Sequence, residues 1–251
     1  MQHGGNIYAF ARQVGCLPEQ VVDFSANINP QQAVDLPSLL SVSLTPYSDP
    51  DYGLLKQAIV QRYPLPDNAD IEIFNGASAA IFALLRYLQP QDVVLYAPLY
   101  GEYERLAERL GCKINIINRL VGWVSDSVTQ QAIPKGSTVI FLNPATPDGT
   151  LYDLPDLFAQ WTAADCHIII DESFLDFCVV ESAMAYIAQY EKLTIIKSLS
   201  KFYGCAGIRI GFIAANADFI HHLKQLEPAW KLSSLDMAYM QQALANTDFI
   251  L

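Results

Sequence analysis

The sequence predicts an α/β protein with a mostly parallel sheet and helices on both faces, and three observations support this. First, short β-branched apolar runs alternate with longer segments of helical periodicity between residues 71 and 226. Second, runs such as HIII (167–170) are apolar throughout, which is typical of strands buried on both faces. Third, 52% of the 251 residues are hydrophobic and only 16% are charged, which suits a large core.

The first part of this pattern predicts three strands separated by two helices. IEIF (71–74), DVVLYA (92–97) and CKINIIN (112–118) are short and apolar, and most are rich in β-branched residues, so we expect strands there. SAAIFALLRYL (78–88) and GEYERLAERLG (101–111) place apolar residues at helical spacing, so we expect helices. This order of elements builds βαβ units, in which the strands lie parallel.

The pattern continues in the second half of the chain. The expected strands are TVIFLN (138–143), HIIID (167–171), LTIIKS (193–198) and IRIGFIAA (208–215). The expected helices are LPDLFAQWTAAD (154–165), with Pro155 in its first turn, and ADFIHHLKQL (217–226).

The two ends of the chain differ from this pattern. Residues 1–45 have weaker periodicity, and we assign them to an N-terminal arm. Residues 46–230 then form one large domain. Residues 231–251 begin a helical pattern and end on Phe249, Ile250 and Leu251. We expect them to start a helix between domains, with the remainder of a small C-terminal domain missing.

Charge and composition exclude several classes of function. The formal net charge of −11 argues against nucleic acids and anionic membranes as partners. No apolar run reaches the ~18 residues that a membrane-spanning helix needs. The five cysteines include no CxxC pair, so we expect neither a disulfide framework nor a metal site. The N-terminus has no apolar leader, and we expect a cytoplasmic protein.

Two residues with chemical potential follow neighbouring strands. Asp171 ends the strand at 167–171, and Lys201 follows the strand at 193–198. Ligands of α/β sheets bind at the carboxyl ends of strands, so both side chains would face one crevice. A lysine in an apolar pocket can be a nucleophile, and an aspartate can keep a pyridine nitrogen protonated. That pair suits pyridoxal phosphate, although a purely structural ion pair would fit the same pattern.

An anion could bind near the same edge of the sheet. Ala77 and Ser78 begin the helix expected at 78–88, where free N–H groups and the helix dipole favour an anion. Ser198, Ser200 and Arg209 would add hydroxyls and a guanidinium. The alternative for Ser78 is simple capping of its helix.

One aromatic residue and several absent motifs complete the picture. Tyr100 follows the strand at 92–97 and could stack on a flat ring or pack as an ordinary aromatic residue. The chain contains no GxGxxG, GxxxxGK[ST], GxSxG or HExxH motif. A Rossmann-type nucleotide site, a P-loop, a serine hydrolase elbow and a zinc protease helix are therefore not expected.

These residues resemble a known family. SLSKFYGCAGIRIGF (198–212) resembles the lysine motif of fold-type I pyridoxal-phosphate enzymes, which include the class I and II aminotransferases. DESFLDF (171–177) resembles their aspartate segment, and NPATPDG (143–149) their NPNNPTG turn. The resemblance implies the large domain of an aspartate aminotransferase-like fold over residues 46–230, with pyridoxal 5′-phosphate as cofactor.

The resemblance also implies a role for each matching residue. Lys201 would bond to the cofactor and shuttle protons, Asp171 would pair with the pyridine nitrogen, and Tyr100 would stack on the ring. Tyr47 would reach the cofactor phosphate of a neighbouring subunit, which implies a homodimer. Thr146 would lie beside the ring hydroxyl. The groups implied to hold the cofactor phosphate within the subunit belong to Ala77, Ser78, Ser198, Ser200 and Arg209.

Two branches of the family fit the chain, namely histidinol-phosphate aminotransferases and the threonine-phosphate decarboxylases of cobalamin biosynthesis. HGGNIYAFARQVG (3–15) and VVDFSANINP (21–30) are similar to the decarboxylases, in which positions matching His3, Gly4 and Asn27 contact the substrate. The resemblance thus implies a lyase that converts L-threonine O-3-phosphate, a small phosphorylated amino acid, to (R)-1-aminopropan-2-yl phosphate. An aminotransferase would use the same lysine, so that alternative stays open.

The chain departs from the family pattern in two ways. Thr146 replaces an asparagine of the NPNNPTG turn, and Asp148 replaces its threonine and would add negative charge there. The family also continues into a small domain that carries arginines for the substrate carboxylate. We therefore expect a cofactor-binding fold with little turnover, and a non-catalytic remnant of the fold is the further alternative.

Overall fold

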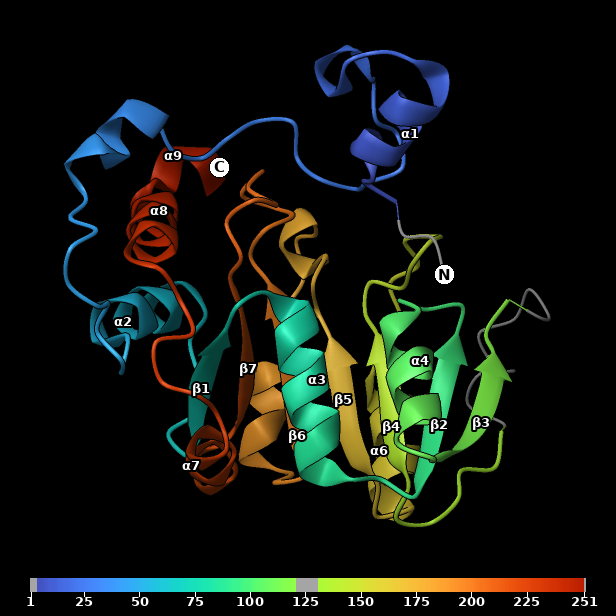
Figure 1. Ribbon diagram of the computed structural model, residues 1–251. Helices are drawn as coiled ribbons and strands as arrows, with labels where there is room; N and C mark the ends of the chain where they lie inside the picture. The colour runs from blue at the N-terminus through green and yellow to red at the C-terminus, as the bar shows by residue number, and fades with distance from the viewer. Residues whose placement is uncertain (1–3, 121–130, 251) are drawn as a thin grey trace.

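The computed structural model describes residues 4–120 and 131–250 (Figure 1). Within them, one seven-stranded sheet has the order β1-β7-β6-β5-β4-β2-β3. Its strands are β1 (Ala69–Phe74), β2 (Asp92–Ala97), β3 (Lys113–Asn118), β4 (Thr138–Leu142), β5 (His167–Asp171), β6 (Leu193–Ser198) and β7 (Gly211–Asn216). β7 is antiparallel to its neighbours β1 and β6, whereas the other described pairs are parallel. The predicted mostly parallel sheet is confirmed.

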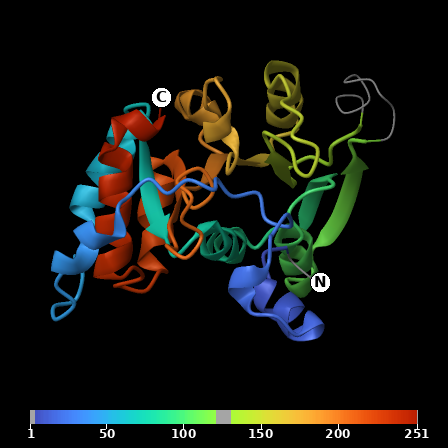
Figure 2. The same ribbon diagram turned by 90° about the horizontal axis from the view of Figure 1, so that it is seen from above.

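Helices cover both faces of the sheet, as the sequence predicts (Figures 1 and 2). The helices on one face are α3 (Ala77–Leu88), α4 (Glu102–Arg109) and α7 (Ala217–Gln225). Those on the other face are α2 (Gly53–Arg62), α6 (Pro155–Ala163) and α8 (Ser234–Ala245). The chain also contains α1 (Ile7–Val14) near its beginning and α9 (Thr247–Ile250) near its end.

The central strands are buried on both faces, which explains their continuous apolar runs. In β5, Ile168 and Ile170 pack into one core layer, while Ile169 points into the other. Full burial of each such side chain contributes about 1.5–3 kcal/mol to the free energy of folding. On the α6 side, the indole N–H of Trp161 donates to the hydroxyl of Tyr96 at 2.9 Å, so this buried indole is paired.

The strand expected at 208–215 begins later than predicted, at Gly211. Residues 199–210 form a loop instead, in which Ile208 N–H donates to Cys205 O and Leu199 N–H donates to Ile210 O. Because this connection is short and contains no helix, it reverses the chain and makes β7 antiparallel to β6. The Lys201 loop follows β6 and therefore lies at the carboxyl edge of the parallel strands.

The N-terminal arm (residues 4–45) crosses above this carboxyl edge (Figure 2). Its backbone is attached to the Lys201 loop, since Asn29 N–H donates to Lys201 O at 3.0 Å. The Asn29 side-chain amide donates to Phe202 O, also at 3.0 Å. The arm contains α1, which the sequence pattern does not predict because only Ala11 of that helix is buried.

The C-terminal helix α8 packs against the large core and the arm. Its Tyr239, Met240 and Ala243 join the core cluster that contains α2. The Gln242 side chain accepts a hydrogen bond from Ser38 of the arm at 2.6 Å. The segment expected to start an interdomain helix is thus helical and rests on the large domain.

We expect His167, the first residue of β5, to make stability depend on pH. Its Nε2 lies 2.9 Å from the Thr194 hydroxyl, and burial, with a contribution from the charge of Lys192, lowers its pKa to about 4. The unfolded chain binds this proton below about pH 6.5, but the folded chain binds it only near pH 4. Stability should therefore fall by up to about 3 kcal/mol as the pH drops through this window.

Urea denaturation between about pH 7 and pH 4 measures this contribution. His167→Gln should remove most of the slope, whereas the control His222→Gln, on the exposed side of α7, should leave it unchanged. Equal slopes in the wild type and in His167→Gln would contradict the assignment.

Candidate active site

A cavity of about 390 Å³ opens at the carboxyl edge of the parallel strands. The arm, the first turn of α3 and the loops after β2, β4, β5 and β6 all contribute to its wall. The sequence-predicted residues that line it are Gly4, Asn27, Ala77, Ser78, Tyr100, Thr146, Asp171, Ser198, Ser200, Lys201 and Arg209. Segments up to about two hundred residues apart in sequence therefore meet here.

Lys201 presents its amine to this cavity from the loop after β6. Its Nζ lies 4.5 Å from the centre of the Phe174 ring. Burial lowers the pKa of Lys201, the carboxylate of Asp171 opposes this, and the charge of Arg209 adds to the lowering. Within the described part of the chain, Lys201 makes no ion pair with Asp171. At a given pH, a larger fraction of this amine is therefore neutral than in an ordinary lysine, and the neutral form is the nucleophile.

Asp171 is held in one orientation at the end of β5. It is 5% exposed, its Oδ2 accepts a hydrogen bond from Tyr103 at 2.7 Å, and its Oδ1 accepts from Ser173 N–H at 2.9 Å. Burial, together with the neighbouring carboxylate, raises the pKa of Tyr103 well above its ordinary value, so this hydroxyl remains a donor. Tyr103 was missed by the sequence reasoning, because its place in α4 predicts only a core aromatic residue.

The first turn of α3 and the guanidinium of Arg209 form an anion cradle. The helix is capped by Gly76 with no side-chain hydrogen bond, so the capping alternative for Ser78 is wrong. The Ser78 hydroxyl lies 3.3 Å from that of Tyr100 instead. A Cβ at Gly76 would lie 2.4 Å from Nη2 of Arg209, so only glycine lets the guanidinium approach this helix start.

Glycine also allows β7 to approach the same helix. A Cβ at Gly211 would lie 2.6 Å from the backbone nitrogen of Ala77. The free N–H groups of the first helical turn and the Arg209 charge therefore lie close together, on the wall that also contains Ser198 and Ser200. This combination suits a phosphate group.

Comparison with known proteins identifies the family. The family model described as "Aminotransferase class I and II" matches residues 18–251 of this chain. The chain belongs to this family. Enzymes of the family depend on pyridoxal 5′-phosphate.

Individual relatives come from both branches of the family. The threonine-phosphate decarboxylase of Salmonella typhimurium is 28% identical over 260 aligned residues, which cover 98% of this chain and 70% of the relative. The histidinol-phosphate aminotransferase of Sodalis glossinidius is 30% identical over 218 residues, which cover 78% of this chain and 60% of the relative.

Solved structures show the same fold. A histidinol-phosphate aminotransferase from Clostridium acetobutylicum has a TM-score of 0.76 at 24% identity, covering 92% of this chain and 71% of its own. An L-threonine-O-3-phosphate decarboxylase from Porphyromonas gingivalis has a TM-score of 0.73 at 23% identity with the same coverage. The predicted aspartate aminotransferase-like large domain is thereby confirmed.

The family turn at 143–149 corrects one expectation. Thr146 lines the cavity as expected, but Asp148 does not line it. Its Oδ1 lies 2.8 Å from Nη1 of the buried Arg119, which neutralises the negative charge that the sequence predicts in this turn. Burial opposes ionisation of Asp148, but hydrogen bonds from Thr150 and Arg119 outweigh it and lower its pKa. Arg119 was missed because no family motif contains it.

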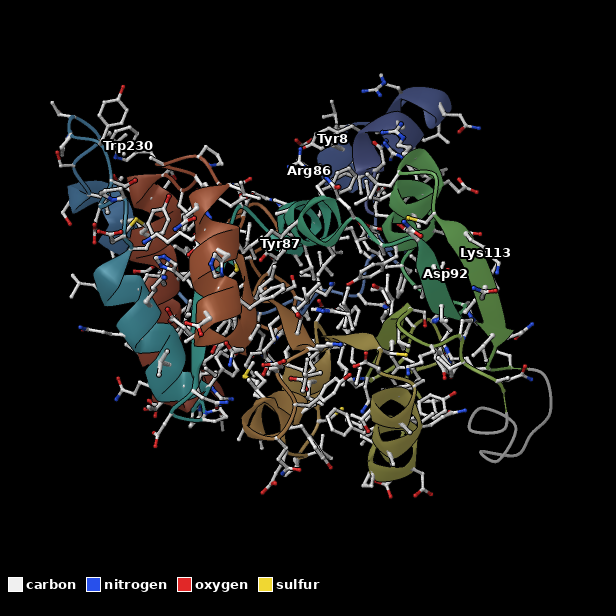
Figure 3. The ribbon with its side chains drawn as sticks, turned by 90° about the horizontal axis from the view of Figure 1, so that it is seen from below. Tyr8, Arg86, Tyr87, Asp92, Lys113 and Trp230 are labelled. Carbon is white, nitrogen blue, oxygen red and sulfur yellow. The ribbon has the colours of Figure 1, made fainter. Side chains whose placement is uncertain are left out.

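One sequence-predicted residue does not line the cavity, and another lies outside the described residues. Tyr47 is 81% exposed and packs at 4.9 Å against the ring of Trp230, which lies at the outer edge of the molecule in Figure 3. Its role in a neighbouring subunit stays a prediction. His3 lies outside the described residues, although the adjoining Gly4 lines the cavity.

The described ranges contain no group of three or more histidine, cysteine and acidic side chains placed to hold a metal. They also contain no helix that is both long and apolar enough to cross a bilayer.

Gly204 controls how the arm sits on the Lys201 loop. Its φ is +61°, and a Cβ there would lie 1.9 Å from Gln31 O and 2.9 Å from Asn29 O. The arm backbone therefore rests directly on this glycine. Since Gly4 and Asn27 line the cavity, this contact helps to determine where the arm closes it.

We expect Gly204→Ala to detach the arm. Limited proteolysis should cleave residues 4–30 faster by about tenfold or more. The protease cleaves molecules in which the arm is detached, and each loss of about 1.4 kcal/mol in the free energy of arm docking raises the population of such molecules tenfold. Gly111→Ala is the matched control, since Gly111 has a φ of +73° but no atom within 4 Å of its Cβ position. Equal cleavage of the two variants would show that backbone strain, and not the contact with Gln31, causes the effect.

Proposed function

We propose that this chain binds pyridoxal 5′-phosphate and decarboxylates L-threonine O-3-phosphate to (R)-1-aminopropan-2-yl phosphate, as a carbon–carbon lyase. The observation that carries the proposal is the meeting of three groups around one cavity. These are the amine of Lys201, the carboxylate of Asp171 and the anion cradle between Arg209 and α3.

The residues present fit the cofactor. The cradle, with the hydroxyls of Ser78, Ser198 and Ser200, would hold its phosphate. Asp171 would face the ring nitrogen, and Tyr100, which is 36% exposed, offers a flat face to the ring. When bound, the cofactor supplies an electron sink that stabilises the carbanion left by loss of CO2.

The chain's own groups would orient the reactants and move protons. Tyr103 and Ser173 N–H each occupy one oxygen of Asp171, which fixes the carboxylate so that its charge can hold a proton on a ring nitrogen. Lys201 Nζ, with its lowered pKa, can release a proton to the carbon that has lost its carboxylate and take one up again. The arm, through Gly4 and Asn27, would contact the substrate and exclude water.

The arm favours the decarboxylase over the aminotransferase. Loss of CO2 and transfer of an amine need the same lysine, so only residues that orient the substrate can separate them. The segments 3–15 and 21–30 are similar to the decarboxylases, and the alignment with the Salmonella relative covers 98% of this chain. A histidinol-phosphate aminotransferase is the second candidate, which the Sodalis and Clostridium relatives support.

We further propose that the protein acts as a homodimer. Several apolar side chains of the segment before α2 are highly exposed, among them Phe24 at 92%, Leu40 at 88% and Tyr47 at 81%. Surfaces of this kind are typical of protein–protein contacts. Tyr47 would then be available to the cofactor phosphate of a neighbouring subunit.

The cofactor proposal predicts a covalent chromophore. Added pyridoxal phosphate should give the purified protein a visible absorption band, and borohydride reduction should remove this band while fixing the cofactor covalently to the chain. Lys201→Ala should abolish both the band and the fixation. Lys192→Ala, which removes a surface lysine paired with Asp165, is the control and should leave both intact. A visible band and covalent fixation that both persist in Lys201→Ala would disprove the role of Lys201.

The substrate proposal predicts CO2 and aminopropanol phosphate from threonine phosphate, with no requirement for glutamate. If Thr146 limits the reaction by failing to reach the cofactor, Thr146→Asn should raise kcat by about tenfold, roughly the worth of one restored hydrogen bond. No gain in Thr146→Asn would remove that explanation. Glutamate-dependent amine transfer to or from histidinol phosphate would favour the second candidate.

A further inference from the structure

Arg119 is a buried cation beside the cavity that the proposed chemistry does not use. It follows β3 directly, and its side chain is 1% exposed. A guanidinium cannot lose its proton in a protein, so this burial requires compensation. Among the residues that the structure describes, the compensating groups lie in two segments, the loop at residues 97–100 after β2 and the turn at residues 143–152 after β4.

Arg119 is bound first to the 97–100 loop. Its backbone N–H donates to Ala97 O at 3.0 Å. Its Nε and Nη2 both donate to Pro98 O, at 3.2 and 2.8 Å. Pro98 is two residues before Tyr100, which lines the cavity. The guanidinium therefore determines where the backbone that carries Tyr100 can lie.

The same guanidinium holds the tip of the 143–152 turn. Nη2 donates to Thr146 O at 2.5 Å, and Nη1 lies 2.8 Å from Oδ1 of Asp148. Nη1 also lies 3.5 Å from the hydroxyl of Tyr152. Thr146 itself lines the cavity, so the residue whose carbonyl is bound is also part of the wall.

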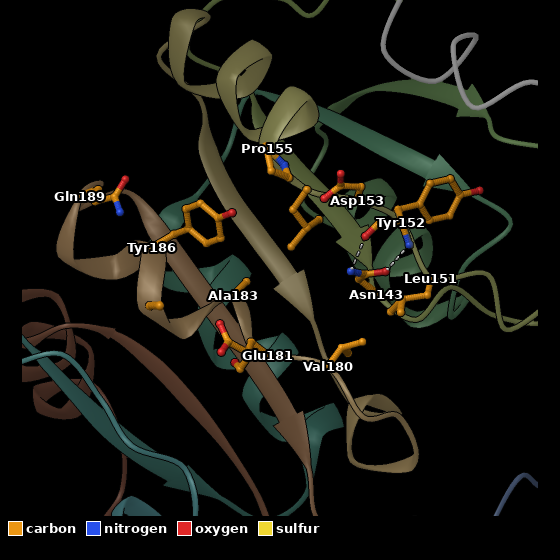
Figure 4. A pocket seen from close by; sticks show the side chains of 13 residues that line it. Asn143, Leu151, Tyr152, Asp153, Pro155, Val180, Glu181, Ala183, Tyr186 and Gln189 are labelled. Carbon is orange, nitrogen blue, oxygen red and sulfur yellow. Dashed lines mark hydrogen bonds between the residues drawn. The ribbon is translucent and has the colours of Figure 1, made fainter.

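The base of the turn is closed separately. The Asn143 side chain donates to Tyr152 O at 3.2 Å and accepts from Tyr152 N–H at 2.9 Å, as Figure 4 shows. The Asn143 backbone N–H in turn donates to Asp171 O at 3.0 Å. The base is thus fixed to the sheet, whereas in the described structure the tip is held to the 97–100 loop by Arg119.

We propose that Arg119 is a positioning residue that sets the distance between the cavity walls carrying Tyr100 and Thr146. The inference rests on the proposed binding of pyridoxal phosphate in this cavity. Three features of arginine make it suited to this task, namely a planar fork, several donors in fixed directions and a permanent charge. Lysine would bring the charge but could not bind both carbonyls and Asp148 in the same geometry.

Asp148 has a supporting part in this arrangement. Its carboxylate balances the charge of Arg119, and it also accepts a hydrogen bond from Thr150 within the turn. Without it, the buried guanidinium would keep its carbonyl partners but lose its counter-charge. The aspartate at this position therefore belongs with Arg119, although the family turn has a threonine there.

The test compares Arg119→Met and Arg119→Lys with the control Arg105→Met. Arg105 lies on α4 and forms an ion pair with Glu102 at 2.8 Å, but its side chain is 39% exposed. The first measurement is the Kd for pyridoxal phosphate, obtained by titrating its absorption band. The second is hydrogen exchange of the non-proline amides at 97–100 and 143–152 without cofactor. The third is the Tm of each variant.

We expect both Arg119 variants to raise the Kd for pyridoxal phosphate by about tenfold or more. A displaced wall would lose contacts to the cofactor, and each loss of about 1.4 kcal/mol of binding free energy raises the Kd tenfold. Exchange should accelerate in both segments together, while amides of β5 and β6 keep their protection. Arg105→Met should change neither quantity. If Arg119→Met does not fold, Arg119→Lys, which retains the charge, provides the comparison.

Two results would overturn the inference. One is a folded Arg119 variant with unchanged Kd and unchanged exchange in both segments. The other is faster exchange throughout the protein with an unchanged Kd, which would mean that Arg119 only stabilises the fold. If the wild type itself binds no pyridoxal phosphate, the proposed function fails, and the exchange measurement alone then decides whether Arg119 joins the two segments.

Discussion

The parallel pairing of β5 with β6 is the constraint on which the candidate site depends. In this register Asp171 lies opposite Ile196, so the loops that follow both strands emerge at one edge of the sheet. Both faces of the sheet are covered by helices, and polar groups can therefore reach a cavity only at such an edge. Lys201, Asp171 and the start of α3 meet there, and the arm closes the space above them.

Close contacts at three glycines help to assemble this edge. Gly76 admits Arg209, Gly211 admits Ala77, and Gly204 admits the carbonyl of Gln31. In each case a Cβ would overlap another atom by a wide margin. These contacts bring the anion cradle and the arm close to Lys201; a larger residue at Gly204 or Gly211 would collide with backbone, and one at Gly76 would displace the Arg209 guanidinium.

Buried charges around the cavity have partners outside it as well as on its wall. Arg119 and Asp148 neutralise each other between two loops, and Tyr103 supports Asp171 from α4. Because these partners fill the donors and acceptors on the outer side, the inner sides of the loops and the carboxylate remain available to a ligand. The turn at residues 143–149 departs from the family pattern at Asp148, but the pairing with Arg119 balances the charge of this residue.

The sequence by itself determined the fold class, most strand and helix positions and part of the cavity lining, including Lys201, Asp171 and Arg209, because apolar periodicity and short motifs are local properties. It could not predict α1, which buries little surface, or the late start of β7, which follows from the loop after β6. Only the tertiary structure decided that Ser78 does not cap its helix, that Asp148 pairs with Arg119 and that Tyr103 holds Asp171. These contacts join segments distant in the chain, and no local pattern specifies which distant partner a polar group will meet.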